Sequence, residues 1–186
     1  MSNPIIFCTN NRHKIKHTRL IIKNNNFNIN LEYNKFDDVI DIPEYQGEAE
    51  YVAIEKAKLM YNKIKLPLLT ENSSFCFNAL NGLPGPYIKS FQNKIGVDGL
   101  YNMLIGFEDK TAYQQSIFTL ILSENEIHTF IGRTYGTIVS PIDGDIFVPN
   151  NYNVPTRSLP FHIQLKIMPR YHALKKLNSF LNPICN

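Results

Sequence analysis

The chain opens with a short apolar run, a polar turn and then an amphipathic segment. Pro4–Thr9 is apolar up to its last residue, which predicts a buried strand. Asn10 and Asn11 are suited to cap a helix, and Arg12–Lys23 places aliphatic side chains among basic ones, which predicts a surface helix. A helix that begins directly after a strand offers free N–H groups and a positive dipole end, so this turn suits a phosphate group.

The next segments predict a strand, a helix and another strand. Asn28–Phe36 alternates apolar with polar residues, as a half-exposed strand does. Glu48–Ile64 has apolar residues at helical spacing, and Leu66–Thr70 is a second buried strand. The glycines and prolines of Asn81–Pro86 predict a tight, rigid turn. A β-α-β-like unit followed by this turn therefore accounts for the first half of the chain.

The second half of the chain predicts a long hairpin between helices. Thr111–Leu122 and Glu126–Val139 are rich in β-forming residues and are separated by a short polar segment, which predicts an antiparallel pair. We expect helices at Tyr87–Asn93, Val97–Ile105 and Tyr171–Leu181 and a loop at Asn150–Ser158. Because no repeat or clear linker interrupts the pattern, residues 1–186 are expected to form one elongated α/β or α+β domain with two lobes.

Composition and charge narrow the class of protein. Of the 186 residues, 44% are apolar and 19% are charged, which excludes a wholly disordered chain. No apolar run approaches the ~18 residues of a membrane span, and no basic segment precedes a long apolar stretch at the N-terminus, so we expect a soluble, cytoplasmic protein. The three cysteines have no paired spacing, which argues against a disulfide framework or a zinc site. The net charge of +3 is compatible with phosphate-bearing partners without requiring them.

Several motifs together point to one enzyme family. The longest is residues 76–89, which read CFNALNGLPGPYIK. The supporting segments are Asp41–Gly47, Gly106–Lys110, Gly132–Gly136 and the spacing of Thr9, Asn11 and Lys14. With these motifs spread over nearly its whole length, the chain resembles the inosine triphosphate pyrophosphatase (ITPase) family. The resemblance implies an α/β fold in which a long mixed sheet is flanked by helices, with a deep cleft between two lobes.

The resemblance implies a reaction as well as a fold. Members of this family hydrolyse deaminated purine nucleoside triphosphates, such as ITP, XTP and dITP, to the monophosphate and pyrophosphate. They use magnesium and are usually homodimers. This chemistry needs a divalent cation held by carboxylates, a base that activates water, and cations that neutralise the triphosphate. A purine nucleotide, Mg²⁺ and a second copy of the chain are therefore the implied partners.

Four positions match phosphate contacts of the family. Thr9, Asn11 and Lys14 match its phosphate-binding turn, where a hydroxyl, an amide and an ammonium group can face phosphate oxygens. Lys89 matches a further phosphate contact after the rigid turn. From the residues alone, helix capping and two solvated lysines would explain the same pattern. The resemblance is what favours phosphate binding.

The catalytic segment departs from the family pattern. Glu44 matches a metal-coordinating carboxylate and Glu71 keeps an acidic position, but Asn72 stands where the family has the aspartate that binds metal and activates water. An amide offers magnesium a carbonyl oxygen but carries no charge and cannot accept a proton at neutral pH. Adjacent residues on a strand point to opposite faces, so we do not expect Glu71 to replace the missing base.

The segments that recognise the base depart as well. The family's aromatic stacking segment aligns with Ile142–Asp145, where no aromatic residue remains. The serine and histidine that read the purine edge align with Met168 and Pro169, and only Arg170 of that motif is kept. A site built to hydrogen-bond a base loses discrimination steeply when such groups vanish. The five histidines have no metal-ligand spacing, and we assign them no catalytic role.

Two hypotheses follow. The first is a divergent magnesium-dependent nucleotide pyrophosphatase with relaxed base specificity. The second, which we favour for activity, is a pseudoenzyme that keeps the fold to bind a nucleotide without turnover, or to bind an RNA-containing assembly such as the ribosome. Basic residues cluster between Arg12 and Lys23, as an RNA contact would require, although a basic helix is more often a solvated face.

Overall fold

The computed structural model is built around one mixed β-sheet and describes residues 4–33, 43 and 45–183. The sheet has seven strands in the order β2-β1-β3-β5-β6-β7, with β4 paired to β3 outside that path. The strands are β1 (Ile5–Phe7), β2 (Leu31–Tyr33), β3 (Leu68–Phe77), β4 (Pro84–Gly85), β5 (Thr111–Ser123), β6 (Glu126–Ile142) and β7 (Asp145–Pro149). β1 is parallel to β2 and β3, whereas β3, β5, β6 and β7 form antiparallel pairs. The expected β-α-β unit and hairpin are therefore confirmed.

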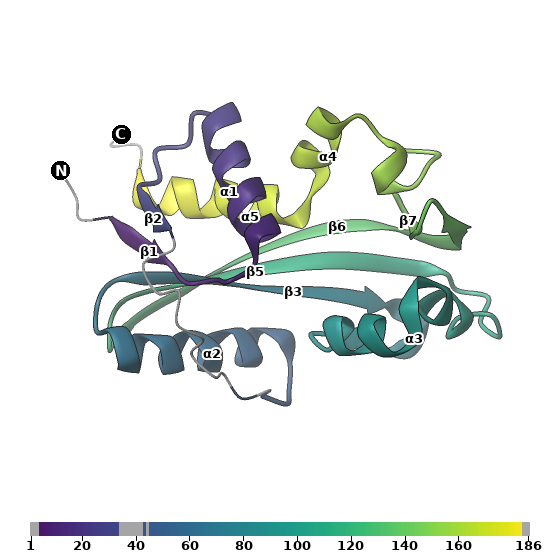
Figure 1. Cartoon of the computed structure of the whole chain (residues 1–186), viewed down its shortest axis with the longest axis horizontal. Helices are drawn as coiled ribbons and strands as arrows, with labels where there is room; N and C mark the ends of the chain where they lie inside the picture. Colours follow the sequence, from purple (N-terminus) through teal and green to yellow (C-terminus); the bar gives the residue numbers. More distant parts are fainter. Residues whose placement is uncertain (1–3, 34–42, 44, 184–186) are drawn as a thin grey trace.

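Helices flank the sheet (Figure 1). The helices are α1 (Arg12–Asn24), α2 (Ala49–Ile64), α3 (Ile88–Asn102), α4 (Phe161–Ile167) and α5 (Pro169–Leu181), with short 3-10 turns η1 (Asn78–Leu80) and η2 (Thr156–Ser158). α1, α4 and α5 lie on one side and α2 on the other, while α3 packs against the far ends of β3, β6 and β7. The two helices expected before the hairpin are joined in α3 across a kink at Gly96, whose φ is +67°. In the described part of the chain, no helix is long and apolar enough to cross a membrane.

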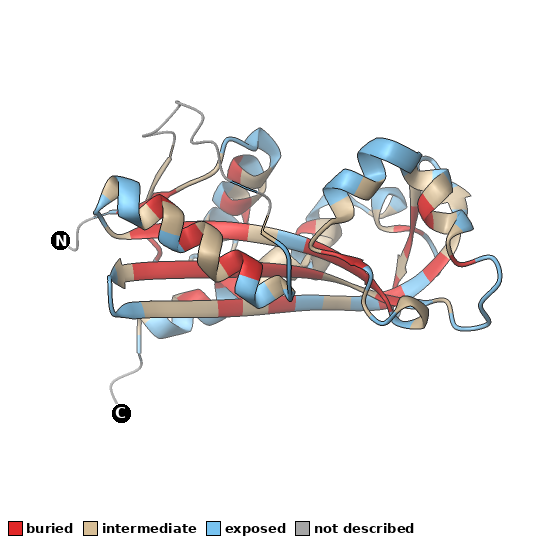
Figure 2. Ribbon diagram, turned by 90° about the horizontal axis from the view of Figure 1, so that it is seen from below, coloured by how far each residue is buried: buried red, intermediate tan, exposed pale blue. Residues whose placement is uncertain are grey.

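Among the described residues, three apolar clusters hold these helices to the sheet, and Figure 2 shows the buried residues along the strands and the helices that cover them. Successive side chains of β3 point to opposite faces of the sheet, so neighbouring residues of this strand belong to different clusters. Leu69 packs in the cluster under α1 and α5, and Phe75 packs with Leu100 of α3. Leu68 points the other way and packs with Met60 of α2. The polar middle of β3 therefore lies between two lobes that share one face of the sheet.

A glycine sets how closely α5 approaches this sheet. A Cβ atom on Gly132 of β6 would lie 1.9 Å from the carbonyl oxygen of Pro169 and 2.5 Å from the backbone nitrogen of Ala173. The first turn of α5 therefore rests directly on the strand. Arg170, the second residue of the helix, is held over the middle of the sheet as a result.

Several elements differ from the expectations, among them β4, which pairs with β3 inside the expected turn. β3 continues to Phe77 rather than ending at Thr70, because its polar residues remain paired with β5. β7 and α4 were not expected at all. Asp143 and Gly144 have φ values of +50° and +72° and form the tight turn into β7. Because Asp-Gly is a strong hairpin signal, β7 was predictable from the residues.

Candidate functional site

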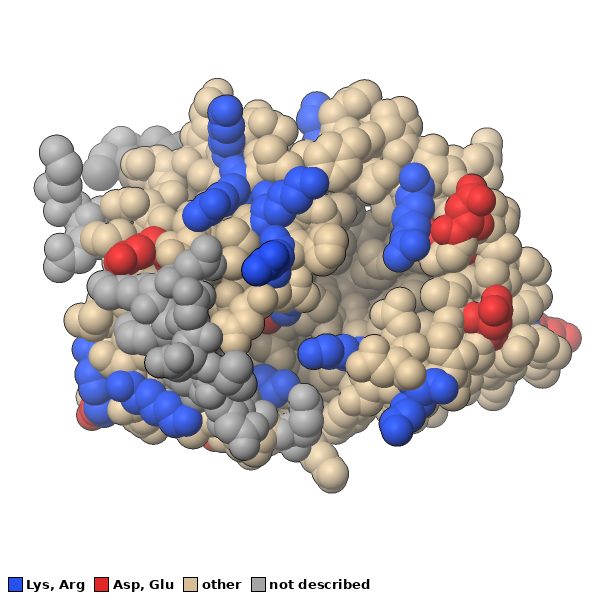
Figure 3. Space-filling model, in the orientation of Figure 1, with Lys and Arg blue, Asp and Glu red and all other residues tan. Residues whose placement is uncertain are grey.

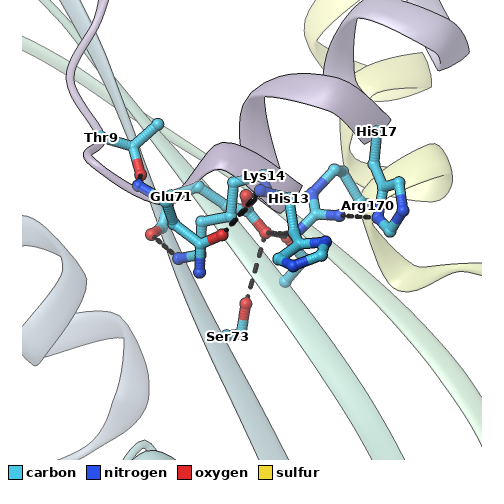
Figure 4. A network of polar contacts seen from close by, with 9 residues as sticks. Thr9, His13, Lys14, His17, Glu71, Ser73 and Arg170 are labelled. Atoms are coloured by element: carbon cyan, nitrogen blue, oxygen red, sulfur yellow. Dashed lines mark hydrogen bonds and ion pairs between the residues drawn. The ribbon is translucent and has the colours of Figure 1, made fainter.

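The edge of β3 is open between two of its neighbours. β1 pairs with β3 at Leu68 and Leu69, and β4 pairs with it at Phe75 and Cys76. Among the residues that the structure describes, no strand pairs with Thr70–Ser74 on that side. Backbone groups there need other partners, and side chains from α1 and α5 gather at this place (Figure 4).

Two predicted phosphate residues hold the turn between β1 and α1. The hydroxyl oxygen of Thr9 accepts a hydrogen bond from the Asn11 backbone N–H at 3.2 Å. The side-chain oxygen of Asn11 accepts from the backbone N–H groups of His13 at 2.9 Å and Lys14 at 3.2 Å. Helix capping is thus a role of Asn11 in this structure. The NH₂ of the Asn11 amide is the donor with which its side chain could face a phosphate.

Lys14 is turned into the protein rather than solvated. Its Nζ donates to the backbone carbonyl oxygen of Glu71 at 2.6 Å, which fixes the ammonium group at the open edge of β3. Burial lowers the pKa of Lys14, the Glu71 carboxylate opposes that change, and the charges of Arg170, Lys56 and Lys89 lower the pKa further. Lys14 is therefore subject to repulsion from other cations as well as attraction by Glu71. A bound anion would relieve that repulsion.

A buried ion pair joins β3 to α5. The Nε of Arg170 donates to Oε2 of Glu71 at 3.0 Å, and Nη2 donates to Oε1 at 2.9 Å, which is a bidentate contact. The side chain of Glu71 is 0% exposed and that of Arg170 is 13% exposed. Ser116 also donates to Oε1 at 2.7 Å. Burial would raise the pKa of Glu71, but the charges of Arg170 and Lys14 and the hydrogen bonds from Arg170 and Ser116 hold it at about 2.

Glu71 is consequently a poor base for activating water. Both of its oxygens are engaged, and a carboxylate with a pKa of about 2 does not hold a proton at neutral pH. Asn72 is the next residue on β3, so its side chain points to the opposite face of the sheet, toward α2. The structure thus brings Lys14, Glu71 and Arg170 together and separates Asn72 from Arg170 across the strand.

A cavity of about 430 Å³ lies between the two lobes on the Arg170 side of the sheet. Met168, Pro169 and Arg170 line it where α5 begins, and Phe75 and Ile146 supply apolar walls. In the view of Figure 3, a hollow lies in the middle of the molecule, with Lys and Arg side chains around it and over α1. Its volume is in the range of small-molecule sites. The three positions that the resemblance assigns to the base therefore line one cavity. Lys89 does not line it but lies exposed at the start of α3, next to Ile88, which does.

The turn between β6 and β7 brings no aromatic ring to this cavity. Gly144 and Asp145 line it instead. The two carboxylate oxygens of Asp145 accept from the backbone N–H groups of Phe147 at 3.1 Å and Arg157 at 3.0 Å. A base bound here finds no stacking partner in this turn, as the alignment of the motif indicated.

The described residues do not fit a magnesium site held by the protein alone. Among them, no group of three or more His, Cys, Asp or Glu side chains is placed to hold a metal ion. Mg²⁺ is usually bound by carboxylates together with substrate phosphates, but Asn72 offers one neutral oxygen and the carboxylate of Glu71 is taken up by Arg170 and Ser116. Glu44, the metal ligand that the resemblance implies, lies outside the described residues.

Two residues of the site were given no role in it from the sequence. Nδ1 of His17 lies 3.1 Å from Nη1 of Arg170, and Ser116 donates to Glu71. His17 is one turn beyond Lys14, so helical spacing was a usable signal that both side chains share a face of α1. Ser116 lies opposite Ser73 in the register of β5 and β3. That register cannot be derived from the residue pattern, because both strands have polar residues over several positions.

A second cavity, of about 470 Å³, lies on the opposite face of the sheet. It is bounded by the start of α2, by the rigid turn before α3 and by β5 and β6, and Leu83, Tyr113 and Arg133 line it. Leu83 is 50% exposed and Tyr135, whose ring lies 5.8 Å from that of Tyr113, is 51% exposed. This part of the sheet therefore presents apolar and aromatic surface to the outside.

Comparisons with known proteins agree on one family. The model of the Ham1 family matches residues 5–180. A Ham1 protein from Coxiella burnetii superposes with a TM-score of 0.83 and 21% identity, covering 97% of this chain and 98% of the other. The Staphylococcus aureus Ham1 protein gives 0.80 and 21%, covering 96% and 98%. A nucleoside-triphosphatase described as a dITP/XTP pyrophosphatase, from Mycobacterium abscessus, gives 0.74 and 21%, covering 97% and 100%. At this identity the likeness to these structures shows a shared fold.

Proposed function

The chain belongs to the Ham1 family, and from that premise we propose that it binds a deaminated purine nucleoside triphosphate but hydrolyses it only weakly. The triphosphate lies along the open edge of β3, near Lys14 and Lys89, and the base enters the cavity beside α5. The Mycobacterium abscessus protein of the same fold is described as a dITP/XTP pyrophosphatase. That description supports dITP and XTP as substrates here, and the family resemblance adds ITP.

The observation that carries this proposal is the arrangement of charge around Glu71. The Glu71 carboxylate accepts two hydrogen bonds from Arg170. The ammonium group of Lys14 donates one of its three hydrogen bonds to a backbone oxygen, which leaves two N–H donors for a ligand. The charges of Arg170 and Lys89 also act on Lys14, and the Glu71 carboxylate opposes them. A triphosphate would bring negative charge to these basic side chains.

Hydrolysis to a monophosphate and pyrophosphate needs a base. Water must attack the α-phosphorus as the bond to the bridging oxygen of the β-phosphate breaks, and the proton of the water must be taken up. Asn72 cannot take it, and Glu71 is held as a weakly basic carboxylate by Arg170. Loss of a general base typically costs a factor of about 10² to 10⁴ in rate. The chain therefore still binds the nucleoside triphosphate but hydrolyses it slowly.

Members of the Ham1 family are generally metal-dependent. In this chain the donors near Asn72 make a poor Mg²⁺ site, so we propose that magnesium is held mainly by the phosphates of the bound nucleotide. When bound, the ion would supply positive charge to the phosphates. The described side chains orient the nucleotide through Lys14 and Arg170.

Replacing Lys14 tests the proposed phosphate site. Lys14→Met should weaken ITP binding by about tenfold or more, because a charge-assisted hydrogen bond contributes ~1.5–3 kcal/mol. Isothermal titration calorimetry with ITP measures the change. Lys16→Met, on the exposed side of the same helix, is the matched control and should bind like the wild type. If the wild type binds no purine triphosphate, or if both variants behave alike, the proposed site is wrong.

We also propose that the chain forms a homodimer, as the family resemblance implies. The exposed apolar surface around the second cavity is the face we assign to the partner subunit. Placing a charge there should weaken association, because a buried unpaired charge is costly. Tyr135→Glu should therefore shift a dimer toward monomer in light scattering coupled to size-exclusion chromatography. Ile105→Glu, at an exposed position after α3, should not. A wild type that is monomeric at all concentrations tested would refute the dimer.

The RNA-binding alternative draws less support. Within the basic segment of α1, Lys14 and His17 are turned into the protein. Arg19 lies over the ring of Tyr33 at 4.2 Å and Lys16 over Phe161 at 5.9 Å. These contacts use part of the basic surface within the chain. A nucleotide in the cleft therefore accounts for more of the observed geometry.

A further inference from the structure

The contact between His17 and Arg170 fixes the protonation state of the histidine ring. A guanidinium group donates hydrogen bonds and cannot accept them. Nδ1 of His17, 3.1 Å from Nη1 of Arg170, must therefore be the acceptor. Burial lowers the pKa of His17, the charges of Arg170, His13 and Lys16 lower it further, and Glu71 opposes them. At neutral pH the ring is neutral and carries its single proton on Nε2.

His17 also lines the cavity that we assign to the base. It lies near the start of α5, where Met168 and Pro169 line the same cavity. Neither of those residues offers a side-chain donor, and proline lacks the backbone N–H as well. Gln164 also lines the cavity, but its amide NH₂ already donates to the carbonyl oxygens of Arg157 and Leu159. Arg170 and His17 carry the N–H donors beside Met168 and Pro169.

Arg170 is largely committed to other contacts. Its Nε and Nη2 donate to Glu71, and its Nη1 donates to His17. His17 in turn is packed against Phe161, with ring centroids 6.1 Å apart. The ion pair with Glu71 thus holds Arg170, and Arg170 together with Phe161 holds the imidazole ring. His17 is a preorganised neutral donor rather than a free surface side chain.

We propose that His17 is a specificity-determining residue of this cleft, and that its Nε2–H donates a hydrogen bond to the 6-oxo oxygen of a deaminated purine. This inference rests on the proposed nucleotide binding. A 6-oxo oxygen accepts such a bond, whereas the 6-amino group of adenine presents donors to a donor. His17 thus restores part of the base discrimination that Met168 and Pro169 do not supply.

Affinities for ITP and ATP, measured by calorimetry on the same proteins, test the inference. The wild type should bind ITP more tightly than ATP. His17→Phe keeps a ring against Phe161 but removes both nitrogen atoms. It should weaken ITP binding by about tenfold, the effect of one neutral hydrogen bond, and should leave ATP binding nearly unchanged. The preference for the 6-oxo base should therefore collapse.

Two further variants separate recognition from structure. His17→Gln can accept from Arg170 through its amide oxygen and donate through its amide nitrogen, so it should keep most of the ITP preference. His13→Phe changes the neighbouring exposed histidine one turn earlier, 6.4 Å away between ring centroids, and should match the wild type. Equal loss of ITP and ATP binding in His17→Phe, or no loss, would overturn the role of His17 while leaving nucleotide binding intact. A wild type that binds neither nucleotide would overturn the proposed function and this inference together.

Discussion

Asn72→Asp should raise the rate of pyrophosphate release from ITP by about 10² to 10⁴-fold in the presence of magnesium. The substitution restores a carboxylate on the face of β3 opposite the Glu71–Arg170 pair, at the position where the family resemblance puts metal binding and water activation. The change is isosteric, so the fold should tolerate it. A coupled assay for pyrophosphate, run on the wild type and the variant in parallel, measures the effect.

The matched control for this gain is Asn62→Asp. It makes the same chemical change on the exposed side of α2. Release of pyrophosphate should stay at the wild-type level in that protein and should require magnesium in Asn72→Asp. If Asn72→Asp remains as slow as the wild type although it binds ITP, more than one residue limits turnover.

Glu71→Gln should destabilise the protein by ~3–5 kcal/mol, because it leaves the guanidinium of Arg170 mostly buried without its partner charge. The side chains of this pair are 0% and 13% exposed. Urea denaturation at neutral pH measures the free energy of unfolding. Glu124→Gln breaks the exposed pair with Lys65, whose side chains are 68% and 55% exposed. That control should leave the free energy of unfolding close to the wild-type value, because an exposed ion pair contributes little.

The same ion pair makes stability depend on pH in a defined direction. The pKa of Glu71 is about 2 in the folded protein, against an ordinary value of 4.5. Because the folded state binds the proton less readily than the unfolded state, this contribution is fully present above pH 4.5 and is lost as the pH falls toward 2. Denaturation curves across that range should fall more steeply for the wild type than for Glu71→Gln. Parallel curves would show that Glu71 is not held ionised by Arg170.

The sequence predicts the scaffold well because local signals and the family motifs agree there. The apolar run of β1, the Asn11 cap of α1 and the long hairpin of β5 and β6 all appear where the pattern indicates. β3 was predicted too short, since a polar stretch within a strand has no periodic signal when it lies between two lobes. The pairing with β5 extends it, and pairing is a tertiary property.

The sequence predicted several residues of the site but not the hydrogen bonds between them. Lys14, Glu71 and Arg170 were each named from the sequence. However, Glu71 is 57 positions from Lys14 and 99 from Arg170, so no local spacing could predict that it contacts them. The bidentate pair depends on the close approach of α5 to Gly132. The role proposed for His17 depends on its hydrogen bond with Arg170, so a search for catalytic motifs in the sequence does not find it.

The central claim is that this cleft holds a purine nucleotide but lacks the carboxylate that drives hydrolysis. The most direct measurement is pyrophosphate release by the unmodified protein, with magnesium and ITP, on a preparation whose ITP binding has been established by calorimetry. We expect binding with release close to that of a heat-inactivated sample. Rapid, metal-dependent turnover by the wild type would contradict the claim.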